Sequence, residues 1–175
     1  MAMNAFNKTA VRLAAASGLF GLALAPLQAQ TAAPVQGYAV IGGETIPIPL
    51  LSDGADRTMV NQSGQSNSVT LETQGRGVST TQTQIGSGNR AGVSVAADQT
   101  TFTLMQSGNL NTANVSAVNG SGNRLGIEQV GNGNTSSISA TGQSNTIVSQ
   151  QIGSNLSNTI SDVGSNRTIT VRQVR

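Results

Sequence analysis

Apolar and polar residues alternate in short runs along most of the chain. Small or apolar pairs such as Val69/Leu71, Phe102/Leu104 and Leu125/Ile127 enclose a polar or small residue. This period of two predicts half-buried β-strands of about five residues. No run shows a helical period with capping residues, so the sequence predicts an all-β protein.

Glycines set a register for these strands. From Gln62 onward they recur every 11 residues, with Ala97 in the one missing place and one extra residue near Asn119. Glycine supplies positive φ at no steric cost, so we expect tight turns at these positions. The predicted turn glycines are Gly64, Gly75, Gly86, Gly108, Gly120, Gly131, Gly142, Gly153 and Gly164.

Glutamine doubles the period. A Gln stands two residues before every second place of the register, at Gln62, Gln84, Gln106, Gln129 and Gln151, and Gln173 begins a further unit. The full repeat is therefore 22 residues of strand, turn, strand and turn. Five copies span 62–83, 84–105, 106–128, 129–150 and 151–172.

A single strand pair cannot bury so thin an apolar stripe, so the copies must stack. Stacking predicts a two-sheet β-solenoid with Val, Ile, Leu, Ala and Phe102 inside and equivalent residues about 4.8 Å apart. The interior also receives amides, which are costly to bury unless they are hydrogen-bonded.

Identical amides in a stack can bond one another from coil to coil as a ladder. The strict 22-residue spacing favours ladders for the Gln residues. Asn follows most glycines by three residues, and here a ladder and an ordinary turn role are equally compatible with the pattern. These candidates are Asn67, Asn89, Asn111, Asn123, Asn134 and Asn145.

Two further segments precede the repeat domain 62–175. Lys8 and Arg12, the apolar run 13–24 and the small residue Ala29 predict a secretory signal peptide over residues 1–29. The run is shorter than the about 20 residues that a membrane-spanning helix needs, so no integral membrane segment is expected. Residues 30–61 contain several Pro and Gly residues, and this composition predicts an irregular leader.

Composition narrows the function classes. The 175 residues contain no Cys or His, and only 9% are charged. The scattered acids form no evident catalytic pair, so we expect no enzyme, catalytic residue, cofactor or metal site. From Gln30 onward seven arginines balance seven acids, which leaves no basic stripe for nucleic acid.

A solenoid has two ends at which backbone groups lack partners. The sequence shows no obvious cap, the repeats contain no Pro, and the charge after Gln30 is near zero. We therefore expect copies of the chain to stack end to end into a cross-β fibre, which makes the protein a structural filament subunit.

The pattern Gln-x-Gly-x-x-Asn-x-Ala, as QIGSGNRA at 84–91 and nearly so as QSGNLNTA at 106–113, resembles the curlin repeat of bacterial curli. The resemblance covers residues 62–175. It implies a secreted functional amyloid of the biofilm matrix that serves adhesion, exported through the periplasm to the cell surface. The implied partners are other copies, a nucleator subunit, an outer-membrane secretion channel and periplasmic chaperones.

Other interpretations stay open. The chain resembles the major curli subunit more than the minor nucleator, although arginines in the last repeat are similar to the nucleator's basic tail. Thr is frequent at expected outward positions, which also fits an ice-binding solenoid. Those positions are Thr101, Thr103, Thr112, Thr135, Thr146, Thr168 and Thr170, and Arg90 and Arg124 interrupt them.

Overall fold

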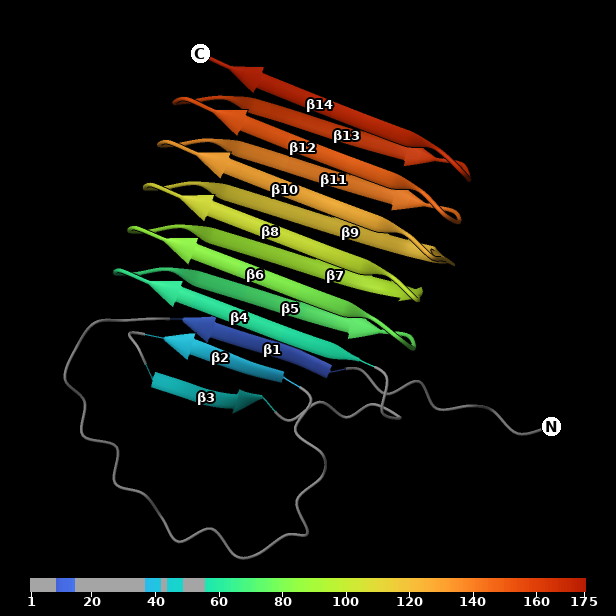
Figure 1. Cartoon of the computed structure of the whole chain (residues 1–175), viewed down its shortest axis with the longest axis horizontal. Coiled ribbons are helices and arrows are strands. Elements are labelled where there is room, and N and C mark those ends of the chain that lie inside the picture. The colour runs from blue at the N-terminus through green and yellow to red at the C-terminus, as the bar shows by residue number, and fades with distance from the viewer. Residues whose placement is uncertain (1–8, 15–36, 42–43, 49–55) are drawn as a thin grey trace, which may run out of the picture.

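A computed structural model describes residues 9–14, 37–41, 44–48 and 56–175, with side chains described for residues 56–175. These residues form strands and turns and no helix. From Arg57 onward the chain winds as a β-solenoid of five coils plus one further strand (Figure 1). The predicted two-sheet β-solenoid of 22-residue repeats is confirmed.

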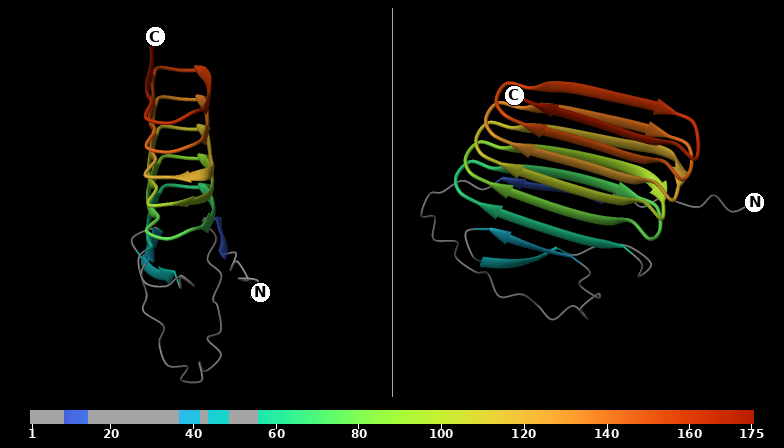
Figure 2. Two further views of the ribbon diagram at one scale, coloured as in Figure 1. Left: turned by 90° about the vertical axis from the view of Figure 1, so that its right-hand side faces the viewer. Right: turned by 45° about the horizontal axis from the view of Figure 1, so that its top comes forward.

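The strands form two sheets that face each other (Figure 2). One sheet, here called sheet A, has six strands in the order β1-β5-β7-β9-β11-β13. Its members are β1 (Thr9–Ala14), β5 (Ser68–Gln74), β7 (Arg90–Asp98), β9 (Thr112–Ser121), β11 (Thr135–Thr141) and β13 (Ser157–Val163).

The other sheet, sheet B, has eight strands in the order β14-β12-β10-β8-β6-β4-β2-β3. Its members are β2 (Gly37–Ile41), β3 (Glu44–Ile48), β4 (Arg57–Ser63), β6 (Ser79–Ile85), β8 (Thr101–Ser107), β10 (Arg124–Val130), β12 (Thr146–Ile152) and β14 (Thr168–Val174).

Successive coils are in parallel register. Arg57 pairs with Ser79, Ser79 with Thr101, and Thr101 with Arg124, which gives steps of 22, 22 and 23 residues. The 23-residue step contains the extra residue predicted near Asn119. The structure absorbs it in the ten-residue strand β9 and in a register shift between β7 and β9 after Ala96.

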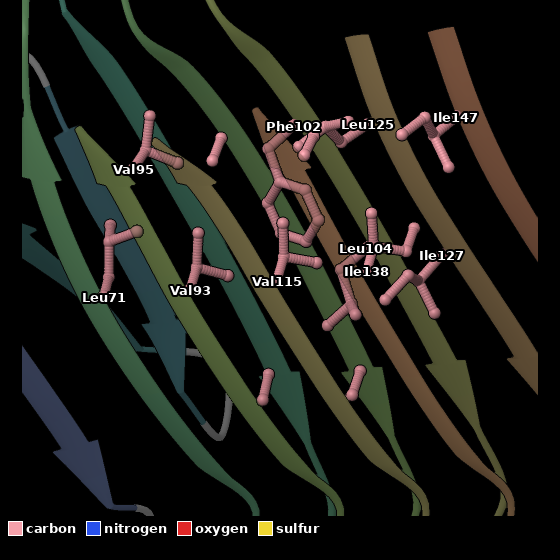
Figure 3. Close-up of a cluster of buried hydrophobic side chains, with 14 of the residues drawn as sticks. Leu71, Val93, Val95, Phe102, Leu104, Val115, Leu125, Ile127, Ile138 and Ile147 are labelled. Carbon is pink, nitrogen blue, oxygen red and sulfur yellow. The ribbon is translucent and has the colours of Figure 1, made fainter. Parts of the chain in front are cut away.

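The core is a narrow column between the sheets. Alternate residues of β6, β8 and β10 are buried, as the period of two predicts, although β4 to β14 have seven to ten residues rather than five. Phe102 lies beside Leu125 and above Thr80 in register, and Leu104 and Ile127 continue the next row (Figure 3). Phe102, Leu125 and Ile147 therefore stand in register in successive coils.

The solenoid begins earlier than predicted. Strand β4 starts at Arg57, five residues before the first predicted repeat, and Asp56 precedes it in the place that Asn occupies later. The irregular leader predicted over 30–61 is wrong for β2, β3 and the start of β4. Its Pro47 lies in β3, the outermost strand of sheet B, where a missing N–H is tolerated.

Most of the predicted signal peptide lies outside the described residues. Its part Thr9–Ala14 forms β1, which pairs antiparallel with β5 and places Val11 opposite Leu71. The signal peptide stays a prediction.

Candidate functional site: amide ladders and strand edges

A continuous ladder of glutamine side chains runs along the interior of sheet B. All five predicted residues are buried, with at most 2% of the side chain exposed. In each step the lower Nε2 donates to the Oε1 of the coil above. The Nε2–Oε1 distances are 2.6 Å for Gln62–Gln84, 2.8 Å for Gln84–Gln106, and 2.9 Å for Gln106–Gln129, Gln129–Gln151 and Gln151–Gln173.

The ladder amides above Gln62 also cross the core. The second N–H of Gln84 donates to the carbonyl oxygen of Ser68 on sheet A at 3.1 Å, and Gln151 donates to Thr135 at 2.9 Å. Gln106, Gln129 and Gln173 repeat this bond. Both N–H groups of an inner amide are thus used, one between coils and one between sheets, which satisfies a group that is otherwise expensive to bury.

The ladder has a direction, and its two ends differ. At its lower end the Oε1 of Gln62 is buried and receives no hydrogen bond from the described residues. At its upper end the Nε2 of Gln173 has a single acceptor among the described residues, the carbonyl oxygen of Ser157 at 3.0 Å. One end therefore lacks a donor and the other end has a donor to spare.

The buried asparagines form columns of a different kind. The Oδ1 of Asn67 accepts the backbone N–H of Asn89 at 3.1 Å, and the Nδ2 of Asn67 donates to the carbonyl oxygen of Gly86 at 2.9 Å. Asn89, Asn111, Asn123, Asn134 and Asn145 donate in the same way to the predicted turn glycines of the coil above. The bonds run mainly from side chain to backbone, so each Asn anchors the turn above it.

Among the residues that the structure describes, one Asn pair matches the identical-side-chain ladder considered from the sequence. Nδ2 of Asn111 donates to Oδ1 of Asn89 at 3.1 Å. The short Asn side chain lies beside the turn, where backbone N–H and carbonyl groups are closer than the next amide. This explains why the columns continue where the Asn is lost, because Leu156 and Arg167 still donate their backbone N–H to Asn134 and Asn145.

Asp56 is a site residue that the sequence reasoning missed. Its Oδ1 accepts the backbone N–H of Val78 at 2.8 Å, and the residue is buried. It thus performs the anchoring role of Asn one half-repeat before Asn67. Asp56 stands 11 residues before Asn67, so the half-repeat spacing could have identified it. No glycine occupies the preceding place of the register, and for this reason the repeat was not followed back to Asp56.

The turns use the predicted glycines and a second position. Seven of the nine predicted glycines have positive φ. Gly164 lies in a turn without positive φ, whereas Gly120 lies inside β9, so the turn prediction is wrong for Gly120. A second left-handed residue follows two or so places later in each turn, at Ser66, Gly77, Gly88, Gln99, Leu110, Gly122, Gly133, Ser144, Asn155 and Asn166. Asn155 and Asn166 therefore occupy the position at which Asn is the best-tolerated residue after glycine.

Gln82 is a buried amide that belongs to no hydrogen-bonded ladder. It is fully buried, its Nε2 and Oε1 have no partner, and its register neighbours are Val60 below and Leu104 above. An unpaired buried polar group costs free energy that a well-packed apolar side chain of similar size avoids.

Replacing Gln82 with leucine is therefore expected to raise the free energy of unfolding, by about 1–3 kcal/mol. Denaturant unfolding of freshly diluted monomer measures the change. The matched variant is Gln84→Leu, two residues along the same strand, which removes ladder bonds and is expected to change stability in the opposite direction. Destabilisation by both substitutions would contradict the assignment of Gln82 as an unpaired amide.

The last coil carries an ion pair between a buried acid and an exposed arginine. Asp162 stands on the inner face of β13 in register with Ala140, and its Oδ1 lies 2.8 Å from a guanidinium nitrogen of Arg167. Its Oδ2 and the Oδ1 of Asn158 are buried without a partner. With Gln62 Oε1, three of the six unpartnered buried atoms of the described residues lie in the first or last coil.

The edges of the two sheets differ at the two ends of the solenoid. At one end β1 lies against β5, and β2 and β3 extend sheet B below β4. At the other end β13 and β14 are the outermost strands, and nothing among the described residues pairs with their outer edges (Figure 1). The upper end is therefore a pair of parallel strand edges available for pairing.

The outward threonines lie on two faces. Thr101, Thr146 and Thr168 belong to one row of sheet B, where Arg124 interrupts them, and Thr103 and Thr170 stand in the next row. Thr112 and Thr135 stand on sheet A, in the row of Arg90. The threonines proposed for ice binding therefore do not form one uninterrupted surface.

Within the described part of the chain, no helix has the length and apolar character needed to cross a membrane. Comparisons with family models, with curated proteins and with solved structures found no match to this chain.

Proposed function

We propose that this protein is the structural subunit of an extracellular cross-β fibre, built by end-to-end stacking of β-solenoids. The observation that carries the proposal is the complementarity of the ladder ends. The buried Oε1 of Gln62 lacks the donor that Gln173 Nε2 can provide, and the ladder direction is the same in every coil. A second copy stacked on the first continues the ladder without reversing it.

The strand edges support the same stacking. In inner coils the first N–H of each sheet B strand donates to the coil above, as Thr146 does to the carbonyl oxygen of Arg167 at 2.7 Å. Bonds alternate along a parallel strand, so the N–H groups of Thr168, Thr170 and Arg172 face the outer edge of β14. An open edge of this kind pairs readily with a strand of another chain.

The curlin resemblance adds the biological setting. It supports a major subunit of a curli-like fibre that serves bacterial adhesion and the biofilm matrix. Its partner is first of all itself, followed by a nucleator, periplasmic chaperones and an outer-membrane secretion channel. The balance of seven arginines and seven acids after Gln30 supports self-association, because little net charge opposes it.

The proposal is tested by fibre growth. The chain, diluted from denaturant to micromolar concentration, is expected to form unbranched fibres that bind thioflavin and are visible by electron microscopy. A chain that stays monomeric for days would contradict the proposal.

An edge-specific variant sharpens this test. Thr170→Pro removes an N–H that has no partner among the described residues, so monomer stability is expected to change by less than about 1 kcal/mol. Fibre elongation from preformed wild-type seeds is expected to fall at least tenfold, because the proline blocks pairing at this edge. Thr170→Val keeps the N–H and is the control. Equal elongation by the two variants would contradict growth through β14.

A further inference from the structure

We propose that the hairpin β2–β3 is a displaceable cover of the β4 edge, and that β14 of a second copy takes its place in the fibre. The inference rests on the proposed function and specifies which surfaces of the two copies meet. It is carried by the register of β2, by the place of the hairpin on the β4 edge, and by the partly buried apolar side chains of β14.

The register of β2 leaves the ladder incomplete. Ile41 is the Cα partner of Gln62, so an isoleucine stands at the position where every coil above has glutamine. The buried Oε1 of Gln62 consequently has no donor. β2 also contributes five paired residues, whereas the coils above pair over seven. The hairpin is therefore a weaker partner for β4 than a solenoid strand would be.

The hairpin also occupies the edge that stacking needs. β2 pairs with β4, and β3 is the outermost strand of sheet B beyond it. β14 of another copy can therefore pair with β4 only when the hairpin leaves this edge.

Strand β14 carries the apolar and amide side chains that match the rows of β4. Ile169, Val171 and Gln173 occupy the rows of Thr58, Val60 and Gln62, as the parallel register from β4 to β14 shows. Ile169 and Val171 pack against the core but are only partly buried. Pairing β14 with β4 of the next copy covers both apolar side chains and places the spare Gln173 donor below Gln62.

The test completes the ladder within one chain. Ile41→Gln in the full-length protein offers Gln62 a donor from its own hairpin, so the lag before fibre formation is expected to lengthen at least tenfold. Ile41→Val is the matched control and is expected to behave as wild type. Ala39→Pro weakens β2 and is expected to shorten the lag. Circular dichroism of the fresh monomers checks that each variant keeps its β-structure.

The outcomes separate the two proposals. A longer lag for Ile41→Gln together with a shorter lag for Ala39→Pro supports the displaceable cover. Fibres that form at wild-type rates in both variants would overturn it while leaving the fibre function in place. A wild-type chain that forms no fibres at all would overturn the fibre function itself.

Discussion

Replacing Gln151 with leucine is expected to lower the free energy of unfolding by about 3–5 kcal/mol. The substitution removes the bonds that Gln151 makes with Gln129, Gln173 and the carbonyl oxygen of Thr135. Three polar groups in or beside the core then lose a partner, and each costs about 1–3 kcal/mol when it is left unpaired. Denaturant unfolding of the monomer measures the loss.

The neighbouring residue provides the control. Gln150 stands in the same strand but on the outer face, where its Nε2 donates to Glu128 at 2.7 Å. Gln150→Leu is expected to cost less than about 1 kcal/mol, because the groups that it releases can reach water. Similar losses from both substitutions would show that the inner ladder has no special energetic role.

Replacing Gly131 with alanine is the second substitution with a large expected effect. Gly131 has a φ of +119°, a region that L-residues avoid, and an added Cβ would overlap the carbonyl oxygen of Gly153 in the coil above. Backbone strain alone costs about 1–3 kcal/mol, and the overlap forces adjacent coils apart. We expect a loss of more than about 3 kcal/mol, or failure to fold.

Gly126 is the matched position for this experiment. It lies in the middle of β10, and a Cβ there would be 3.8 Å from Cγ2 of Val148 in the coil above, an ordinary contact distance. Gly126→Ala is expected to change stability by about 1 kcal/mol or less, in the stabilising direction. Thermal and denaturant unfolding of both variants checks the difference, and equal effects would contradict the role assigned to the turn.

The repeat domain could be predicted because its repeat is strict. Gln84, Gln106 and Gln129 keep one place in each coil, and an amide that bonds its own counterpart must recur at the length of the coil. The inward rows of Val, Leu and Ile follow from the period of two. The spacing therefore fixed both the coil length and the residues of the ladder.

The remaining features depend on contacts that spacing does not encode. Whether Asn89 bonds another side chain or a turn depends on the local distance to the backbone of the next coil. The hairpin β2–β3 pairs without repeating the motif, so the Pro and Gly residues around it predicted irregular structure. The spacing assigned Gln82 no role, because its lack of partners appears only when Val60 and Leu104 are seen below and above it.

The central claim is that one copy's Gln173 meets another copy's Gln62 at a continuous end-to-end contact. Solid-state NMR of fibres grown from an equal mixture of ¹⁵N-labelled and ¹³C-labelled chains tests it directly, because a nitrogen–carbon contact can then arise only between copies. End-to-end stacking through the ladder predicts a cross-peak between glutamine side-chain ¹⁵Nε2 and ¹³Cδ, and this cross-peak disappears when Gln173 is replaced by leucine. Fibres without this cross-peak, or with one that survives Gln173→Leu, would contradict end-to-end stacking through the ladder.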